Sequence, residues 1–444
     1  MMLRAITGAT VLDGTGRAPL PGAVVLIDGD RVRSVSRAAD TVVPAQAEVI
    51  DAAGRYVIPG LMDANVHLFG APLPDVLIEH EGGYAAFVEE AAQVTLRAGI
   101  TTVFDTWGPL GPLQAVRDAI DRGDTAGSRM YVGGNIIGFG GPLSPDFFSP
   151  GDGFGPDTVE RINGQWEHGV GADLLWRTPE QVRSRVRDYV DRHRPDFLKY
   201  AASGHATAFI TFSAAAQRAI VEEGHRAGIT VQAHTTTVES LRMEIEAGAD
   251  LLQHGDITGL EPMPEETLKA IVDRGLPVAA MLFTERHHAW VAEHGSPMMR
   301  RLYNAHMDGN DRRLVEAGAR LLLTTDAFVW GPRLVRHPAF APFRDMADTP
   351  TRLGESHILW LQGALERGMA PMEALLSATR YIAEAYHVAD EVGTLEPGKR
   401  ADLVILEADP LADVQNYTRI VDVIKDGAVV DRDALPLRPV ITTR

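Results

Sequence analysis

The sequence has no cysteine among its 444 residues. Disulfide bonds and thiolate metal ligands are therefore excluded, and any metal must be held by His, Asp, Glu, Asn, Lys or water. A chain without cysteine also suits a reducing compartment, so we expect a cytoplasmic protein. The first residues, Met1 to Ala5, lack the apolar run of a secretory signal, which agrees with that expectation.

Long apolar runs and an excess of positive charge are lacking as well. No stretch of about 18 apolar residues occurs, so we expect no membrane-spanning helix. The formal net charge is −18, and such an acidic surface repels phosphate backbones, which argues against nucleic acid as a partner. Hydrophobic residues make up 45% of the chain and charged residues 23%, a composition typical of a folded globular protein.

Both ends of the chain have the pattern of β-hairpins. Apolar runs meet glycine-containing turns at Asp28-Gly29-Asp30 near the start and at Asp426-Gly427 near the end. Such turns between apolar runs are typical of hairpins. We therefore expect one small β-sandwich, built from residues 1–57 and 389–444, with residues 58–388 inserted between its halves.

The middle of the chain alternates differently, because short β-branched runs are followed by amphipathic stretches with helical spacing. Repeated strand–helix units of this kind indicate a parallel sheet. Eight runs can be counted: Val57–Ile58, Thr101–Phe104, Met130–Val132, Phe197–Lys199, Thr230–Ala233, Leu251–Gln253, Val278–Ala280 and Leu321–Thr324. They predict an α/β fold with a closed (β/α)8, TIM-like barrel. An open doubly wound sheet is the alternative, although no Gly-x-Gly-x-x-Gly phosphate loop favours it.

One connection in the middle of the chain is unusually long. Residues 138–171 are rich in Gly, Pro, Asp and Phe and show no clear periodicity. Unstructured connections of this length are commonly functional lids or disordered segments. We expect this one to be a loop over the C-terminal mouth of the barrel, because it follows the third strand.

Polar side chains come directly after several of the predicted strands. They are Asn65, His67, Lys199, His234, His254 and Asp326, and no other predicted strand offers a further candidate. Reactive side chains of a (β/α)8 barrel project from the C-terminal ends of its strands, so these six would converge. Nitrogen and oxygen donors from several strands suit Zn²⁺ or a similar divalent ion. Taken singly, each has an ordinary alternative, such as a hydrogen-bonded histidine, a surface lysine or a helix-capping aspartate.

Three segments resemble the amidohydrolase superfamily, in the order in which that family has them. Val57 to His67 resembles the first-strand motif Pro-Gly-hydrophobic-hydrophobic-Asp-x-His-x-His. Leu323 to Asp326 resembles the aspartate site of strand eight, and Gly393 to Val404 resembles the return of the chain to the β-sandwich. The resemblance covers nearly the whole chain and implies a metal-dependent hydrolase that acts on a small-molecule substrate.

The resemblance implies a role for each candidate residue. His67 and Asp326 would bind the more buried metal position, and His234 and His254 the more exposed one. Lys199 would be carboxylated and bridge two metals, or stay a plain lysine beside a single metal. Asp326 would take a proton from metal-bound water and give it to the leaving nitrogen. Zn is the expected metal, with Co, Mn or Fe as alternatives, and a homo-oligomer is the expected assembly.

Asn65 departs from the family pattern, which usually has a histidine in this place. An amide oxygen is a weaker ligand for Zn²⁺ than imidazole. We therefore expect one metal per chain, with the buried position weak or empty. A branch of the family with Asn-x-His here includes the phenylurea hydrolases and molinate hydrolase, and the sequence is similar to that branch.

A second departure is Thr235-Thr236, where many peptide-cleaving relatives have a tyrosine that binds the carbonyl. Its absence argues against peptidase activity and directs attention to Tyr200 and His205 as catalytic residues. Because aromatic residues in the predicted loops can line an apolar pocket, we predict cleavage of a C–N bond in a neutral aryl amide, urea or carbamate. The alternatives are a lyase, decarboxylase or isomerase on the same barrel, and a relative without enzymatic activity.

Overall fold

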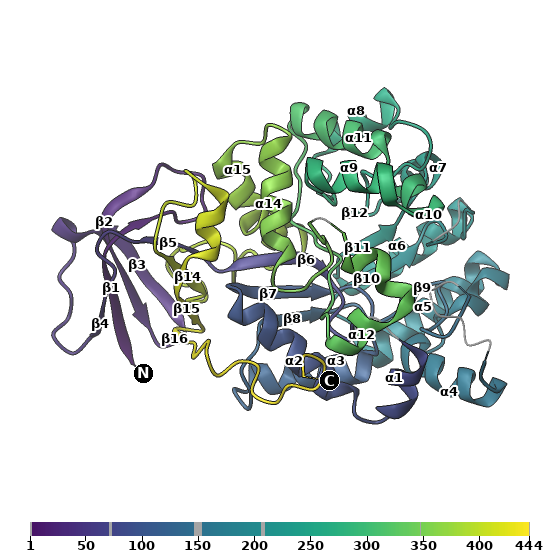
Figure 1. Ribbon diagram of the computed structural model, residues 1–444, viewed down its shortest axis with the longest axis horizontal. Helices are drawn as coiled ribbons and strands as arrows, with labels where there is room; N and C mark the ends of the chain where they lie inside the picture. The colour runs from purple at the N-terminus through teal and green to yellow at the C-terminus, as the bar shows by residue number, and fades with distance from the viewer. Residues whose placement is uncertain (1, 71–72, 146–152, 206–208, 347, 444) are drawn as a thin grey trace.

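Strands from the two ends of the chain form one sheet, which lies at the left of Figure 1 in a computed structural model. The structure describes residues 2–70, 73–145, 153–205, 209–346 and 348–443. The sheet has the order β16-β15-β14-β5-β1-β2-β3, and β4 also pairs with β1. Its strands are β1 (Leu3–Val11), β2 (Leu20–Asp28), β3 (Arg31–Arg37), β4 (Glu48–Asp51), β5 (Tyr56–Pro59), β14 (Leu403–Leu406), β15 (Ile420–Lys425) and β16 (Ala428–Val429).

The main apolar core of this terminal sheet draws on both ends of the chain. It combines aliphatic side chains from the start of the chain, such as Ile6 and Val25, with others from the end, such as Leu403 and Ile424. Strands from both ends of the chain therefore share one sheet and one core. All of these strands belong to one hydrogen-bonded sheet, and its description as a separate β-sandwich stays a prediction.

Parallel strands in the middle of the chain form two sheets that together make a ring. One sheet has the order β6-β7-β8 and the other β13-β12-β11-β10-β9. The segment 321–327 closes the ring, because Leu321 bridges to Val278 and Ala327 bridges to Val66, both in parallel. The result is an α/β fold with parallel sheets, consistent with a TIM barrel. The strands are β6 (Leu61–Val66), β7 (Ile100–Asp105), β8 (Arg129–Val132), β9 (Ile136–Ile137), β10 (Leu198–Ala201), β11 (Val231–His234), β12 (Leu251–Gln253) and β13 (Val278–Ala279).

The first barrel strand is β6, and this corrects the sequence prediction. Val57 and Ile58 lie instead in β5, which pairs with β1 and β14 in the terminal sheet. Gly60 separates the two strands, and a Cβ atom there would lie 2.1 Å from Oγ1 of Thr101. Only glycine fits at this crossing from sheet to barrel. Strand β5 spans the predicted boundary between residues 57 and 58, and the division into three chain segments stays a prediction.

Helices cover the outside of the ring (Figure 1). They turn apolar positions inward, as α2 does with Phe87, Ala91 and Leu96, which are all buried. The helices are α1 (Pro74–Glu79), α2 (Tyr84–Arg97), α3 (Leu110–Asp121), α4 (Pro156–Glu167), α5 (Pro179–His193), α6 (Ala214–Ala227), α7 (Val238–Ala247), α8 (Glu265–Arg274), α9 (Glu285–His294), α10 (Pro297–Leu302), α11 (Ala305–Glu316), α12 (Pro332–Arg336), α13 (Ala341–Arg344), α14 (Ser356–Glu366), α15 (Pro371–Ser377) and α16 (Arg380–Ala385). Short 3-10 turns are η1 (Ala38–Asp40), η2 (Ala172–Trp176), η3 (Pro338–Phe340) and η4 (Val414–Thr418).

The segment 138–171 is not a plain loop, because it contains helix α4. Trp166 of this helix is fully buried, and its ring lies 5.2 Å from that of Phe69 and 6.1 Å from that of Trp107. Both partners follow barrel strands, so α4 packs over the mouth as a lid segment would. The helix was missed because only Ile162 and Trp166 mark its apolar face among many polar residues. Residues 146–152 lie outside the described residues.

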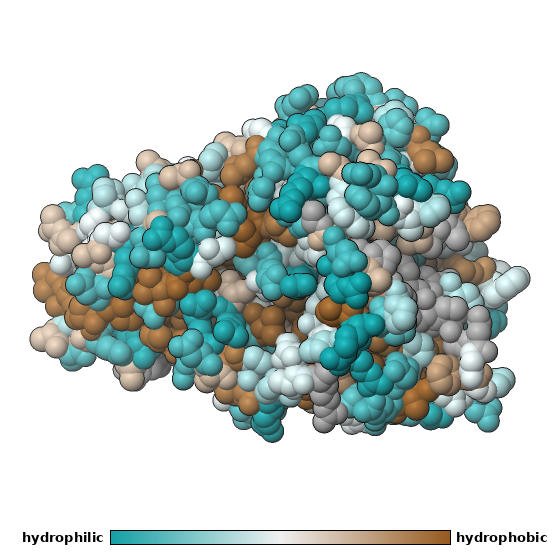
Figure 2. Space-filling model, in the orientation of Figure 1, coloured by the Kyte–Doolittle hydropathy of each residue, from teal (hydrophilic) through white to brown (hydrophobic). Residues whose placement is uncertain are grey.

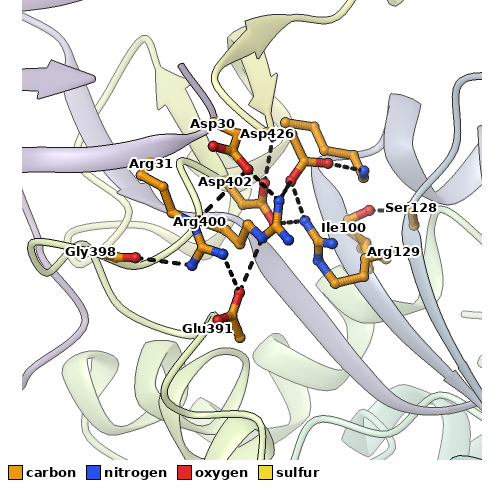
Figure 3. A network of polar contacts seen from close by, with 11 residues as sticks. Asp30, Arg31, Ile100, Ser128, Arg129, Glu391, Gly398, Arg400, Asp402 and Asp426 are labelled. Atoms are coloured by element: carbon orange, nitrogen blue, oxygen red, sulfur yellow. Dashed lines mark hydrogen bonds and ion pairs between the residues drawn. The ribbon is translucent and has the colours of Figure 1, made fainter. Parts of the chain in front are cut away.

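A network of charged residues joins the terminal sheet to the barrel (Figure 3). Arg129, at the start of barrel strand β8, forms ion pairs with Asp402 (3.3 Å) and Asp426 (2.5 Å) of the terminal sheet region. Arg400 pairs with Asp426 and with Glu391 as well. The side chains of Arg129 and Asp402 are 11% and 5% exposed, so this pair is shielded from solvent and helps to hold the two parts together.

The surface seen in Figure 2 is largely hydrophilic over the helices and has a band of apolar residues over the terminal sheet. Among the residues that the structure describes, no helix is both long and apolar enough to cross a membrane.

Candidate metal-dependent active site

The six predicted metal-site residues lie at the C-terminal ends of the barrel strands, on one side of the ring. They come from the ends of β6, β10, β11 and β12 and from the segment 321–327: Asn65, His67, Lys199, His234, His254 and Asp326. Most of them are buried, and the exposed fraction of Asn65 is 0% and that of Lys199 is 1%. Hydrogen bonds, ring contacts and mutual effects on pKa link all six into one cluster.

Backbone geometry turns Asp326 and His254 toward this cluster. Asp326 has a φ of 52° and His254 a φ of 60°, in the left-handed region that side chains other than glycine rarely adopt. The strand-like pairing holds Asp326 there, since its N–H donates to the carbonyl of Asn65 (2.9 Å). Asp63 fixes Thr325, the residue before Asp326, by accepting a hydrogen bond from its hydroxyl group (2.6 Å). Such strained positions cluster at functional sites.

Asp326 holds the centre of the cluster through one oxygen. Its Oδ1 accepts hydrogen bonds from Nδ2 of Asn65 (2.8 Å) and from Nε2 of His67 (2.9 Å). Burial alone would raise the pKa of Asp326, but the neighbouring His67, together with His254 and Lys199, holds the pKa well below its usual value. The carboxylate is therefore ionised at neutral pH and can accept a proton.

Lys199 reaches into the same cluster from β10. Its Nζ donates to Oγ1 of Thr106 (3.0 Å), and Thr106 in turn donates to Oδ1 of Asn65. Burial lowers the pKa of Lys199 to about 8, against the opposing effect of Asp326 and Asp105. A neutral amine is what reaction with CO₂ requires, so this lysine is chemically prepared for carboxylation.

Asp105 and Thr106 belong to the cluster, although sequence reasoning missed both. Asp105 accepts the N–H of Leu68 (2.7 Å) through Oδ2, while its buried Oδ1 has no hydrogen-bond partner among the described residues. Burial raises the pKa of Asp105 to about 7, opposed by His67. The expectation that no other strand offers a candidate is thus wrong. The signal was present, because Asp105 directly follows an apolar run as the six predicted residues do.

Two histidines form the other half of the site. The rings of His234 and His254 lie 5.0 Å apart in an edge-to-face arrangement. Burial, then the nearby His254 and His205, lowers the pKa of His234 well below its usual value. Burial likewise lowers the pKa of His254 to about 3. Both rings are therefore neutral at pH 7 and have a nitrogen lone pair that can bind a metal.

The two further catalytic candidates have different positions. The ring of His205 lies 5.3 Å from that of His234, so His205 borders the site. Tyr200 does not, because its side chain is fully buried and its hydroxyl donates to Oε1 of Gln217 in α6 (3.1 Å). The prediction for Tyr200 is wrong for a simple reason. Successive side chains of a strand face opposite sides, so a strand that directs Lys199 inward directs Tyr200 outward.

Tyr303, which follows α10, is another residue near the site that the sequence did not reveal. Its ring contacts Phe283 in an edge-to-face arrangement at 5.2 Å. Burial, followed by the charges of Asp326 and Asp256, raises the pKa of its hydroxyl, so the side chain lies within electrostatic reach of the site. Nothing local marks it, because it lies between helices α10 and α11, far from the barrel strands in sequence.

The donors present fit a divalent metal ion. Nε2 of His234 and Nδ1 of His254 are buried and have no hydrogen-bond partner among the described residues. Together with an ionised Asp326 and His67, they form the nitrogen and oxygen set that Zn²⁺ and similar ions prefer. In the described part of the chain, no three His, Asp or Glu side chains already stand in coordinating geometry. The donors instead stand as two pairs, His67 with Asp326 and His234 with His254.

Comparison with known proteins defines the class. The model of the Amidohydrolase family matches residues 56–430. The chain therefore belongs to the amidohydrolase family. It is a hydrolase that acts on carbon–nitrogen bonds.

The similarity extends along the whole chain to two solved structures. One is molinate hydrolase, which is 35% identical with a TM-score of 0.93 over 100% of this chain and 97% of that chain. The other is phenylurea hydrolase B, which is 36% identical with a TM-score of 0.93 over 100% of both chains. Imidazolonepropionase of Geobacillus sp. (strain WCH70) is 26% identical over 420 residues, 87% of this chain and 83% of that protein. The branch of the family that the sequence resembles is thus confirmed.

Proposed function

We propose that this hydrolase cleaves the C–N bond of a neutral amide, urea or carbamate that bears an apolar aryl group. The observation that carries the proposal is the arrangement in which Asn65 and His67 share one oxygen of Asp326. These hydrogen bonds join the Asn-x-His motif of the first barrel strand to an ionised carboxylate in the segment 321–327 that closes the ring. The similarity to molinate hydrolase and phenylurea hydrolase B over the full chain supports the same substrate class.

Aromatic side chains next to the site support an apolar substrate. The ring of Trp107 lies 6.0 Å from that of His67, and the ring of Phe139 lies 5.5 Å from that of His234. Aromatic walls with a few fixed polar groups are typical of small-molecule sites. We propose that these rings hold the aryl group while the polar end of the substrate faces Asp326.

We propose one divalent metal per chain, Zn²⁺ before Co²⁺, Mn²⁺ or Fe²⁺. His67, His234, His254 and Asp326 would hold it, with Lys199 beside it. When bound, such an ion polarises a carbonyl and lowers the pKa of water toward about 7.

The residues of the chain then perform the proton transfers. Asp326, ionised at neutral pH, accepts the proton of the attacking water and delivers it to the leaving nitrogen. Asn65 and His67 fix the orientation of its carboxylate, and His205 at the border of the site is placed to donate a hydrogen bond to the substrate. Asn65 offers an amide oxygen that already accepts the hydroxyl of Thr106, which favours a single metal.

We also propose how the chain is organised and where it acts. The terminal domain would consist of residues 1–57 and 389–444, with the barrel of residues 58–388 inserted between its halves. The chain would work as a homo-oligomer in the cytoplasm. The continuous sheet from both termini supports the single terminal domain, and the absence of cysteine suits the cytoplasm. Size-exclusion chromatography with light scattering tests the assembly.

The proposed substrate class is tested with a panel of N-aryl ureas, anilides and aryl carbamates, each assayed for release of the aryl amine. We expect release from at least one compound class by the metal-loaded protein, and none above background from Asp326→Asn. Asp345→Asn is the matched control, because the side chain of Asp345 is 66% exposed and lies outside the site. Activity toward alkyl amides or peptides alone would overturn the aryl preference.

A further inference from the structure

A cavity lies away from the metal site, between the barrel and the terminal sheet. Its volume is about 700 Å³, within the range of small-molecule sites. It is lined by the end of α2, the segment before α14, the start of α14, η4 and Arg432. None of the six candidate metal ligands lines it. We call it the arginine pocket and define it by Arg97, Arg352, His357, Tyr417 and Arg432.

Two arginines of this pocket have no carboxylate partner. Within the described residues, neither Arg97 nor Arg432 forms an ion pair, and both donate only to main-chain carbonyls. Arg432 donates to Arg97 (2.8 Å) and to Ile420 (3.1 Å), and Arg97 donates to Leu435 (3.4 Å). Burial, followed by the nearby charge of Arg97, lowers the pKa of Arg432. Two like charges are thus held together at the edge of a cavity.

The other charges of the lining do not neutralise this pair. The two acidic residues that line the pocket, Asp348 and Glu355, are already paired with Arg286 and Arg352 respectively. Asp422 and Asp433 lie near enough to affect the pKa of Arg432 without forming an ion pair. A local excess of positive charge is unusual on a chain whose net charge is −18, and it favours an anion.

Two polar residues of the wall are uncharged. Burial lowers the pKa of His357 to about 4, which keeps its ring neutral, and Tyr417 has a neutral hydroxyl. Nδ1 of His357 and the hydroxyl of Tyr417 are closed off from solvent and have no hydrogen-bond partner among the described residues. These residues therefore do not offset the charge of the two guanidinium groups.

We propose that the arginine pocket binds a small organic dianion, a dicarboxylate or a phosphate ester, through Arg97 and Arg432. Guanidinium groups bind the oxygens of carboxylates and phosphates in pairs of parallel hydrogen bonds. Two adjacent guanidiniums match two negative charges on one ligand. The volume of the pocket admits a molecule of metabolite size. This site is independent of the reaction proposed for the metal centre.

The test is isothermal titration calorimetry of the full-length, metal-loaded protein with succinate and, in a separate arm, with glycerol 3-phosphate. Succinamide, which has the length of succinate without its charge, is the control ligand. We expect one site per chain for at least one of the two anions, and none for succinamide. The two arms distinguish a carboxylate ligand from a phosphate ligand. If neither anion binds, the proposal is wrong.

Variants assign the binding to the pocket. Arg97→Met and Arg432→Met should each weaken binding by about 10-fold or more, and Arg432→Lys should weaken it less. Arg122→Met is the matched control, because Arg122 is an exposed arginine that pairs with Asp124 and does not line the pocket. Binding that survives Arg97→Met unchanged would place the anion elsewhere, including at the metal, and would overturn the proposal.

A measurement without ligand separates this role from a structural one. If Arg97 and Arg432 repel each other, Arg97→Met should melt at the same temperature as the wild type or higher. A structural arginine would instead lower the melting temperature when removed. A fall in melting temperature together with unchanged anion binding would show that the two arginines serve the fold alone. Arg97 is exposed, so this variant is expected to fold even if Arg432→Met does not.

Discussion

The side-chain amide of Asn65 donates to Oδ1 of Asp326 over 2.8 Å, and this places the unusual residue of the first strand directly on the predicted general base. The same oxygen accepts Nε2 of His67, while the amide oxygen of Asn65 accepts the hydroxyl of Thr106. Asn65 thus acts here as an orienting group for the carboxylate. A metal would have to compete with Thr106 for the only oxygen that Asn65 offers.

Asn65→His should therefore raise the metal content. We expect about one divalent ion per chain in the wild type and a ratio that rises toward two in the variant, because imidazole is the stronger ligand. Inductively coupled plasma mass spectrometry of protein purified without chelator measures both ratios. Asn65→Ala is the control, since it removes the amide without adding a donor and should not raise the ratio. Two ions at full occupancy in the wild type would contradict this account of Asn65.

Asp326→Asn should lower kcat by about 10²- to 10⁴-fold, the range that a positioned general acid–base contributes. Asparagine keeps the shape of the aspartate side chain and can still accept hydrogen bonds from Asn65 and His67, but it cannot take up a proton. Steady-state kinetics at saturating substrate, with metal content checked in parallel, provides the measurement. A variant that retains its metal and most of its kcat would show that another group, such as Asp105, transfers the proton.

Lys199→Met should stabilise the metal-free protein at neutral pH. The native pKa of Lys199 is about 8 against an ordinary 10.5, so the native state disfavours the charged lysine by about 3 kcal/mol below pH 8. Between pH 8 and 10.5 the unfolded state binds the proton that the native state has lost. The wild type therefore gains stability relative to the variant as pH rises through this window.

Urea unfolding of the two metal-free proteins at several pH values measures the difference. Lys269→Met is the control, because the side chain of Lys269 is 70% exposed and its replacement should give a difference independent of pH. Parallel stability curves for the wild type and Lys199→Met would mean that the native state does not lower the pKa of Lys199.

Arg129→Met should lower the free energy of unfolding by about 3–5 kcal/mol, the cost of breaking a buried pair from one side. The change leaves the buried Asp402 without its partner at the contact between barrel and terminal sheet. Arg122→Met, which breaks the exposed pair with Asp124, should cost less than about 1 kcal/mol. Equal losses in the two variants, measured by denaturant unfolding, would rule out a special role for the network in Figure 3.

Much of the fold and site could be predicted because each barrel strand carries its own local signal. An apolar run followed by His, Lys or Asp identified six residues that the structure brings together, although 261 positions separate Asn65 from Asp326. The same signal would have found Asp105. Strand alternation places Tyr200 on the opposite face from its neighbour Lys199, where its hydroxyl contacts Gln217.

Other features depend on contacts that the sequence does not encode locally. Tyr303 is held near the site by tertiary contacts, since its ring packs against those of Phe283 and His287. Helix α4 has a sparse apolar face, and its stability comes from contacts such as that of Trp166 with Phe69. The eighth barrel strand is reduced to isolated bridges, yet the apolar run at Leu321 still marked its place. Tertiary packing decides such elements more than local propensity does.

The central claim is hydrolysis of a C–N bond next to an aryl group, and the most direct measurement follows an anilide in H₂¹⁸O with the metal-loaded protein. The account predicts one aniline per substrate consumed, with ¹⁸O in the carboxylic acid product, and loss of both on Asp326→Asn. Consumption of the substrate without release of aniline, or release without the label, would contradict it.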